Sequence, residues 1–372
     1  MKTKVKYITN VEKVEELSEG EKKIYTEISE KYAFRTNSYY NNLIDWSDEN
    51  DPLRKIVIPD KDETINWGEL DASSESAYTK VPGLEHKYNT TALLLCNDVC
   101  AAYCRFCFRK RLFQSDNEEV EKDVWKGIEY IKEHSEINNV LLTGGDPLML
   151  STKRLIQIFE ELKQIPHVKI VRLGTKVLGF NPFRVLEDEL FLEMLEKYSE
   201  SFQIYFMLHY NHPTELTKES IDAIRAIKKR GVTTVNQTPI IKGVNDDPEV
   251  LGKLMEELSF VGVIPYYIFT CRPTEGNFVY AVPIEEGFRI FQESKKTSSG
   301  LAKTARFVMS HSTGKIEVLS INNGKVILKK HNFPDQDDNE EIMIYDSNPE
   351  AYWFDDYTNL VALPDLETTL IV

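Results

Sequence analysis

The chain has 372 residues, of which 41% are hydrophobic, and this is enough to bury a sizeable core in one large domain or in two. Its formal net charge of −15 argues against a nucleic-acid-binding protein, because such proteins present a basic face. Residues 1–31 lack the apolar run of a signal peptide, and no stretch approaches the roughly 18 apolar residues of a membrane span. We therefore expect a cytoplasmic enzyme.

The chain before residue 89 is polar, and residues 10–31 are predicted to be helical. Strand-like and helix-like segments then alternate. The strand-like runs are 91–95, 138–145, 168–175, 202–210, 233–241 and 263–270, and the main helix-like runs are 118–134, 153–165, 218–230 and 247–260. Near-continuous apolar strands in six βα alternations predict a parallel sheet with helices packed outside it. We expect an α/β fold, a partial (β/α)6 barrel, because the closed form needs eight units.

Three regions follow from this pattern. They are an N-terminal helical or irregular arm (1–88), the (β/α)6 core (89–300) and a small C-terminal extension (301–372). The extension should contain a β-hairpin that turns at Asn322-Asn323-Gly324, because Asn and Gly tolerate positive φ.

Four of the five cysteines lie between residues 96 and 107, and three of them, Cys100, Cys104 and Cys107, follow the first predicted strand. Iron–sulfur clusters are held by thiolates on short loops. Three ligands would leave one iron without a protein thiolate, and a cofactor could bind there. The alternative is a zinc site with Cys96 as a fourth ligand. Zinc ligands usually form two pairs or include histidine, and no histidine lies in this segment, so we predict an iron–sulfur cluster and a core position for Cys96.

The second strand ends in Gly144-Gly145-Asp146. Two glycines let a backbone approach a ligand closely, because no Cβ intervenes, although a strand that ends in this way is a weak signal by itself. Chemistry in parallel α/β folds gathers at the carboxyl ends of the strands. We therefore expect this turn and the cysteine loop to converge.

The cysteine spacing, with an aromatic residue before the third cysteine, resembles the radical S-adenosylmethionine (SAM) superfamily. Within it, several segments are similar to the lysine 2,3-aminomutase family, in order and at plausible separations from residue 81 to residue 318. They include VPGLEHKY (81–88), CAAYCRFCFRKRLF (100–113), VLLTGGDPL (140–148), NQTPIIKGVND (236–246), PYYIFTC (265–271) and the GK of HSTGKIEV (311–318). The resemblance implies an isomerase that moves an amino group from C2 to C3 of an amino acid. It also implies three cofactors: a [4Fe–4S] cluster, SAM and pyridoxal 5′-phosphate (PLP).

The resemblance assigns roles to individual residues. Cys100, Cys104 and Cys107 would hold the cluster, while Gly144, Gly145, Asp146 and Gln237 would contact SAM. Lys315, after the permissive Gly314, would bind PLP covalently, and Lys87 and Tyr88 would contact the PLP phosphate. Arg109 would pair with the substrate carboxylate, for which a planar guanidinium is suited. Lys110 and Arg111 are expected to be solvated, and His209 and His212 are either pocket residues or core histidines.

Two departures concern the substrate. Where the lysine-specific members bind the substrate's ε-ammonium with two aspartates, this chain has Arg272 and Ser310. Because like charges repel where water is excluded, an acidic substrate such as glutamate is expected in place of lysine. The alternative is that Arg272 pairs with Glu275 or Asp246 and leaves the pocket neutral.

Two further departures concern PLP. Thr91 and Phe106 stand where the family has an arginine and a histidine, so a relative that lacks PLP and acts on another amino-acid-like substrate is a second hypothesis. A non-catalytic zinc or iron–sulfur module is the third. The expected partners are a small-molecule amino acid and a reducing electron donor of the flavodoxin or ferredoxin type, with no nucleic acid and no membrane. The oligomeric state is left open.

Overall fold

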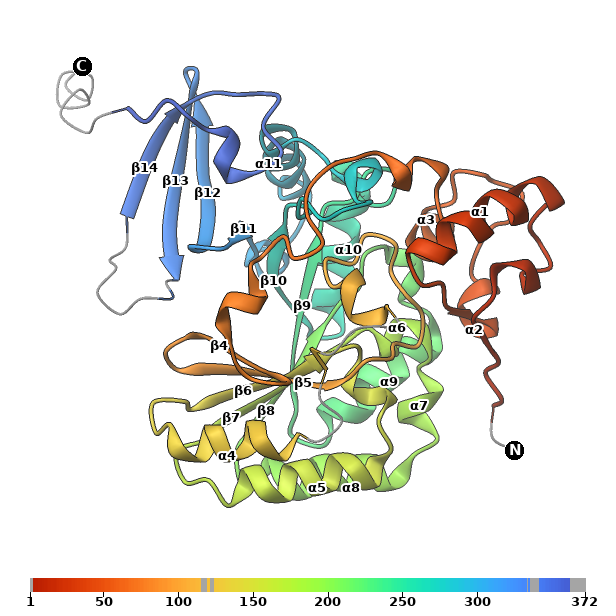
Figure 1. The fold of residues 1–372 in the computed structure, drawn as a ribbon, viewed down its shortest axis with the longest axis vertical. Helices are drawn as coiled ribbons and strands as arrows, with labels where there is room; N and C mark the ends of the chain where they lie inside the picture. Colours follow the sequence, from red (N-terminus) through yellow and green to blue (C-terminus); the bar gives the residue numbers. More distant parts are fainter. Residues whose placement is uncertain (1–2, 115–118, 121–123, 333, 335–340, 362–372) are drawn as a thin grey trace.

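The centre of the computed structural model is one large sheet (Figure 1). The structure describes residues 3–114, 119–120, 124–332, 334 and 341–361. Within them, twelve strands lie side by side in chain order. They are β3 (Thr79–Val81), β4 (Leu84–Tyr88), β5 (Thr91–Asn97), β6 (Asn139–Gly144), β7 (Ile170–Thr175), β8 (Gln203–Leu208), β9 (Thr233–Pro239), β10 (Ile264–Phe269), β11 (Arg306–His311), β12 (Gly314–Asn322), β13 (Lys325–Asn332) and β14 (Glu341–Asp346).

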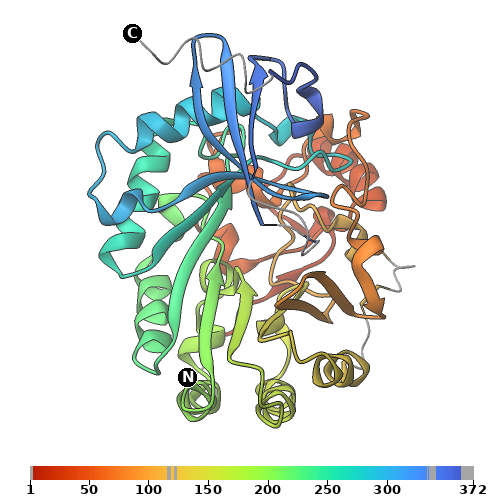
Figure 2. The same ribbon diagram turned by 90° about the vertical axis from the view of Figure 1, so that its left-hand side faces the viewer.

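The strands from β5 to β10 are parallel, and a helix connects each to the next. The principal connecting helices are α4 (Trp125–Glu133), α5 (Thr152–Lys163), α8 (Glu189–Ser199), α9 (Lys218–Lys228) and α10 (Pro248–Phe260), and α11 (Ile284–Ser294) leads from β10 to β11. Two short helices, α6 (Val177–Phe180) and α7 (Phe183–Leu186), precede α8. Figure 2 shows the helices as an arc around the outside of the curved sheet. The predicted partial (β/α)6 barrel is confirmed.

Local sequence explains these elements. The strands carry runs such as Leu93-Leu94-Leu95, and the helices have an apolar stripe that packs on the sheet, as Leu155, Ile158 and Leu162 do in α5. Several helices begin at a side-chain cap: the Asp247 carboxylate accepts hydrogen bonds from the first turn of α10, where Pro248 fits because its missing N–H is not needed.

The N-terminal arm packs beside the barrel, away from the last three strands (Figure 1). It contains α1 (Glu19–Lys31), α2 (Ser38–Asn41), α3 (Pro52–Val57) and a small sheet of β1 (Tyr7–Ile8) and β2 (Thr36–Asn37). A capping box between Ser18 and Glu21 starts α1, so the predicted helix begins later than residue 10. None of the described helices is long and apolar enough to cross a membrane.

The sheet continues past both ends of the predicted core. β3 and β4 add antiparallel strands beside β5, and β11 pairs in parallel with β10. From β11 to β14 the pairing is antiparallel. The hairpin of β12 and β13 turns at Asn323 and Gly324, which have φ of 50° and 70°, as the sequence predicts. Because the strands from β5 to β11 are parallel, their carboxyl ends lie along one edge of the sheet, and the residues that follow them can meet there.

Candidate active site

The three predicted cluster ligands lie on the loop that follows β5. Cys100, Cys104 and Cys107 are each partly buried. Arg105, inside this loop, is 2% exposed, and its guanidinium donates to the carboxylate of Glu63 at 2.9 and 2.6 Å. The Arg105 backbone N–H donates to the carbonyl of Ile56 at 2.8 Å. The arm therefore anchors the middle of the cysteine loop.

The chemistry of this donor set suits an iron–sulfur cluster better than a zinc ion. Cys96 is buried on β5, and its Sγ lies 3.5 Å from the carbonyl of Thr143, so it occupies the core position that the sequence predicts. Among the described residues, no three His, Cys, Asp or Glu side chains are arranged to hold a single metal ion. Three thiols on one short loop, with Cys96 packed in the core, match the thiolate set of such a cluster.

The glycine turn lies against the start of the cysteine loop. The Gly145 N–H donates to the carbonyl of Asn97 at 2.5 Å, and a Cβ at Gly145 would lie 2.6 Å from the backbone nitrogen of Val99. The glycine is therefore required by close approach of two backbones of this chain. Asp146 accepts from the Thr175 hydroxyl at 2.8 Å and from the Lys176 backbone N–H at 2.8 Å. Its carboxylate thus ties the end of β6 to the end of β7, a positioning role that the sequence did not predict.

Replacing Gly145 with alanine tests this contact. Because the new Cβ would meet backbone atoms of Val99, we expect the cysteine loop to shift, with a loss of about 1–3 kcal/mol of folding free energy and less iron bound after anaerobic reconstitution. Urea unfolding and iron content per chain measure both effects. Gly174→Ala is the matched control, because its Cβ would lie 3.7 Å or more from its neighbours. Equal iron content in the two variants would contradict the prediction.

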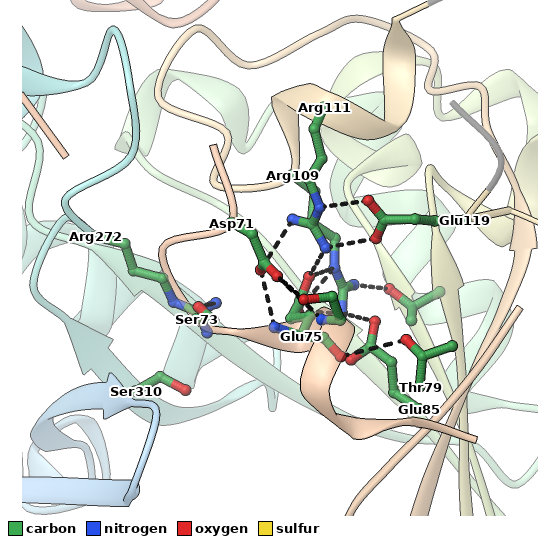
Figure 3. A network of polar contacts seen from close by, with 12 residues as sticks. Asp71, Ser73, Glu75, Thr79, Glu85, Arg109, Arg111, Glu119, Arg272 and Ser310 are labelled. Atoms are coloured by element: carbon green, nitrogen blue, oxygen red, sulfur yellow. Dashed lines mark hydrogen bonds and ion pairs between the residues drawn. The ribbon is translucent and has the colours of Figure 1, made fainter. Parts of the chain in front are cut away.

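Arg109 is buried, and its guanidinium belongs to a network of charges (Figure 3). Glu75, in the 3-10 helix η3 (Glu75–Tyr78), accepts from Nε of Arg109 at 3.2 Å and from Nη2 at 2.9 Å. Nη1 donates to the hydroxyl of Thr143 at 2.9 Å. Burial alone raises the pKa of Glu75, but Arg109 and then Arg111 outweigh burial and hold it well below its usual range. Glu75 thus fixes the orientation of Arg109.

The expectation that Lys110 and Arg111 are solvated is wrong, since they are 5% and 7% exposed. Arg111 donates to Glu75 at 2.7 Å and to Glu119 at 2.8 Å. The ammonium of Lys110 donates to the carbonyl of Gly276 at 3.1 Å, and burial lowers the pKa of Lys110 to about 8. Carboxylates and carbonyls from distant segments compensate these cations, and a run of basic letters cannot reveal such partners.

Lys315 lies at the start of β12 among aromatic rings and basic side chains. Its Nζ donates to Oγ of Ser310 at 3.1 Å and lies 6.0 Å from the centre of the Tyr88 ring. Burial, and then the nearby charge of Arg272, lower the pKa of Lys315 to about 7. A large fraction of this amine is therefore neutral and nucleophilic near pH 7, as a Schiff-base lysine requires.

The residues around Lys315 fit PLP. The ammonium of Lys87 donates to the carbonyl of His311 at 2.8 Å and lies 5.8 Å from the centre of the Tyr88 ring, so both amines border one ring. An ammonium has three N–H donors, and a phosphate could accept from those of Lys87 that His311 does not use. The neutral amine of Lys315 could react with the aldehyde of PLP. The ammonium of Lys87 could bind the phosphate, and the ring of Tyr88 could pack on the pyridine ring.

Arg272 follows β10 and is partly buried beside Ser73 and Ser310 (Figure 3). Its guanidinium donates to Oγ of Ser73 and lies 3.7 Å from the centre of the Phe108 ring. In the part of the chain that the structure describes, no carboxylate forms an ion pair with it. Glu275 pairs with Lys31, and Asp246 accepts from the backbone of Gly243, so the alternative pairing expected for Arg272 is absent here.

Three other predicted residues lie in β9 or in the segment after β8. His209, after β8, lies beside Phe106 of the cysteine loop, and burial lowers the pKa of His209 to about 3. Its Nε2 has no hydrogen-bond partner among the described residues. His212 instead caps a 3-10 helix at residues 213–215. Gln237 lies within β9, opposite Tyr267 of β10.

Sequence reasoning missed Glu75, Glu85 and Thr143 as members of the site. Glu85 lies in the quoted VPGLEHKY segment, and Thr143 directly precedes the glycine turn. Two acidic residues before a basic run are too common to be noticed. Glu75 and Glu85 are distinguished only by being buried beside Arg109, which is 34 residues away from Glu75 in the sequence.

Comparisons with known proteins agree with this geometry. The Radical SAM superfamily model matches residues 94–255, which include the cysteine loop and the glycine turn. A protein of Aquifex aeolicus, provisionally named an L-lysine 2,3-aminomutase, is 54% identical over 364 residues, 97% of each chain. The L-lysine 2,3-aminomutase of Fusobacterium nucleatum is 34% identical, over 81% of this chain and 71% of its own. The glutamate 2,3-aminomutase of Clostridioides difficile is 35% identical, over 79% and 69%.

A partial barrel whose first strand leads into three closely spaced cysteines defines the class of enzymes that generate radicals from SAM. Within that class, the chain belongs to the lysine 2,3-aminomutase family. It is an enzyme of the isomerase type, and the cofactors of the family are a [4Fe–4S] cluster, SAM and PLP.

Proposed function

We propose that this chain is a PLP-dependent 2,3-aminomutase that converts an acidic α-amino acid, glutamate or a close analogue, into its β-amino isomer. The observation that carries the choice of substrate is Arg272, a partly buried guanidinium beside the proposed PLP lysine with no ion-paired carboxylate among the described residues. The names of the relatives include both lysine and glutamate enzymes, so we infer the substrate from the side chains of the site.

The charge around Arg272 favours an anionic substrate. Burial lowers the pKa of Arg272 to about 10, and Glu75 opposes this effect. At neutral pH the guanidinium remains charged, and it contacts the hydroxyl of Ser73 and the ring face of Phe108. A substrate carboxylate would supply the direct ion pair that Arg272 does not form within the described chain, whereas the ammonium of lysine would be repelled.

We assign a separate role to each group of residues at the site. Cys100, Cys104 and Cys107 would hold the cluster, which with SAM supplies the radical that removes a hydrogen atom from the substrate. PLP would supply the conjugated ring system that stabilises the migrating amino group. Lys315 would hold PLP, and Lys87 and Tyr88 would position it. Arg109 and Arg272 would bind the two carboxylates of the substrate and so orient it between these groups. A small redox protein would supply the electrons.

An amino acid panel tests the proposal. The reduced protein with SAM and PLP should form a β-amino product from glutamate faster than from lysine, and Arg272→Asp should lower kcat/KM for glutamate by about 100-fold. Chromatography of derivatised products measures both. Arg289→Asp on α11 is the matched control, because Arg289 is exposed and remote from the site. A wild-type preference for lysine, or unchanged kinetics in Arg272→Asp, would overturn the substrate assignment.

A further inference from the structure

Glu85, on β4, has a buried carboxyl oxygen that accepts no hydrogen bond from the part of the chain that the structure describes. The residue is 4% exposed, and its Oε1 has no hydrogen bond among the described residues. The nearest ion-pairing atom is Nη2 of Arg109, at 3.6 Å, which is too far for a hydrogen bond. Because buried polar atoms are nearly always hydrogen-bonded, an unpaired oxygen beside a proposed substrate-binding residue indicates a missing ligand group.

The donors of Arg109 show where this ligand would sit. A guanidinium has five N–H groups. Glu75 accepts from Nε and Nη2, and Thr143 accepts from Nη1. One N–H on each terminal nitrogen therefore remains to donate to a ligand, and a carboxylate could accept from them. Oε1 of Glu85 lies 3.6 Å from Nη2, on which one of these N–H groups remains, and Figure 3 shows Glu85 at the edge of the same network.

The charges that face Glu85 come from four segments. Glu75 faces it from η3, Arg109 and Arg111 from the segment after the cysteines, Arg272 from the end of β10, and Lys87 from its own strand. Burial, and then the negative charge of Glu75, raise the pKa of Glu85 to about 8, and the arginines oppose this effect only in part. Near pH 7 the group is therefore mostly a neutral acid with one O–H donor.

We propose that Glu85 is a substrate-binding residue that, as a neutral carboxylic acid, donates its O–H to a substrate carboxylate held by the remaining N–H groups of Arg109. This inference rests on the proposed function, in which Arg109 binds a carboxylate, and adds a second donor to that site. When Glu85 ionises, it loses the donor, repels the substrate carboxylate and competes for Nη2 of Arg109. Binding of a carboxylate substrate should therefore weaken at alkaline pH.

The test is the dissociation constant of glutamate from the cofactor-loaded protein, measured by calorimetry across neutral and alkaline pH. For the wild type, we expect the constant to rise about tenfold per pH unit above the apparent pKa of Glu85. Glu85→Gln keeps an N–H donor and cannot ionise, so its constant should stay within about threefold of the wild-type value at neutral pH and remain nearly flat. Glu129→Gln on α4 is the matched control, because Glu129 is exposed, pairs with Lys132 and should leave the wild-type profile unchanged.

Three results would overturn the inference. The first is an identical alkaline rise in wild type and Glu85→Gln, because another group would then be responsible. The second is a large loss of neutral-pH binding in Glu85→Gln with its fold intact, because the carboxylate form would then be needed. The third is a wild-type constant that does not change with pH, a measurement that needs no variant. If binding shows the expected dependence but no β-amino product forms, the proposed reaction fails and the role of Glu85 stands.

Discussion

Replacing Lys315 with alanine should prevent covalent attachment of PLP and lower turnover by roughly 10²–10⁴-fold, the range for loss of a positioned reactive group. The reason is the environment of the amine. It donates a hydrogen bond to the neutral hydroxyl of Ser310, aromatic rings lie around it, and burial and Arg272 lower the pKa of Lys315 to about 7. Of the described lysines near the site, Lys87 and Lys110 have a pKa lowered to about 8, and the pKa of Lys315 is lower still.

Borohydride reduction followed by peptide mass spectrometry locates PLP independently of turnover. In the wild type, the label should be on the peptide that contains residue 315, and its yield should fall about tenfold per pH unit below the pKa of Lys315, because protonation removes the nucleophile. Lys80→Ala is the matched control, since Lys80 is an exposed lysine on β3. A full label yield in Lys315→Ala, or a label on Lys87, would refute the assignment of Lys315.

Replacing Glu63 with alanine should destabilise the protein by about 3–5 kcal/mol, the usual cost of leaving a buried charge unpaired. Glu63 is fully buried and accepts from Arg105 at 2.9 and 2.6 Å and from the hydroxyl of Tyr280 at 2.9 Å. Lys110 lies 3.7 Å from the same carboxylate. Removal of the Glu63 carboxylate would leave the buried cations Arg105 and Lys110 without their anion. Because Arg105 lies between two of the predicted cluster ligands, iron content should fall as well.

Chemical unfolding measures this effect, and Glu129→Ala is the control, because its exposed ion pair with Lys132 should contribute less than about 1 kcal/mol. Burial raises the pKa of Glu63, but Arg105 outweighs burial and lowers the pKa below its usual value. The stabilising contribution of Glu63 is therefore present near neutral pH and is lost only as the pH falls through the acidic range, below the unfolded value. Equal stability of the two variants would show that the Glu63 carboxylate does not neutralise Arg105.

Local sequence patterns determined much of this protein. The six parallel strands, their helices and the Asn-Gly hairpin could be predicted, because apolar periodicity and turn residues act over a few neighbouring positions. The spacing of Cys100, Cys104 and Cys107 indicated the class of enzyme for the same reason, since one short loop carries all three thiols. Family resemblance then singled out Lys315, and the structure gives it surroundings that suit its role.

Only the tertiary structure decided which charges meet. Arg109 pairs with Glu75, Arg105 with Glu63, and the carboxylate of Asp146 binds the end of β7, although each pair is separated by 29 residues or more. The same folding buries Lys110 and Arg111, which the sequence suggested would be solvated. The preference of a charged side chain for burial depends on whether an opposite charge is beside it. That partner comes from another strand end or from the arm, so no local pattern contains the information.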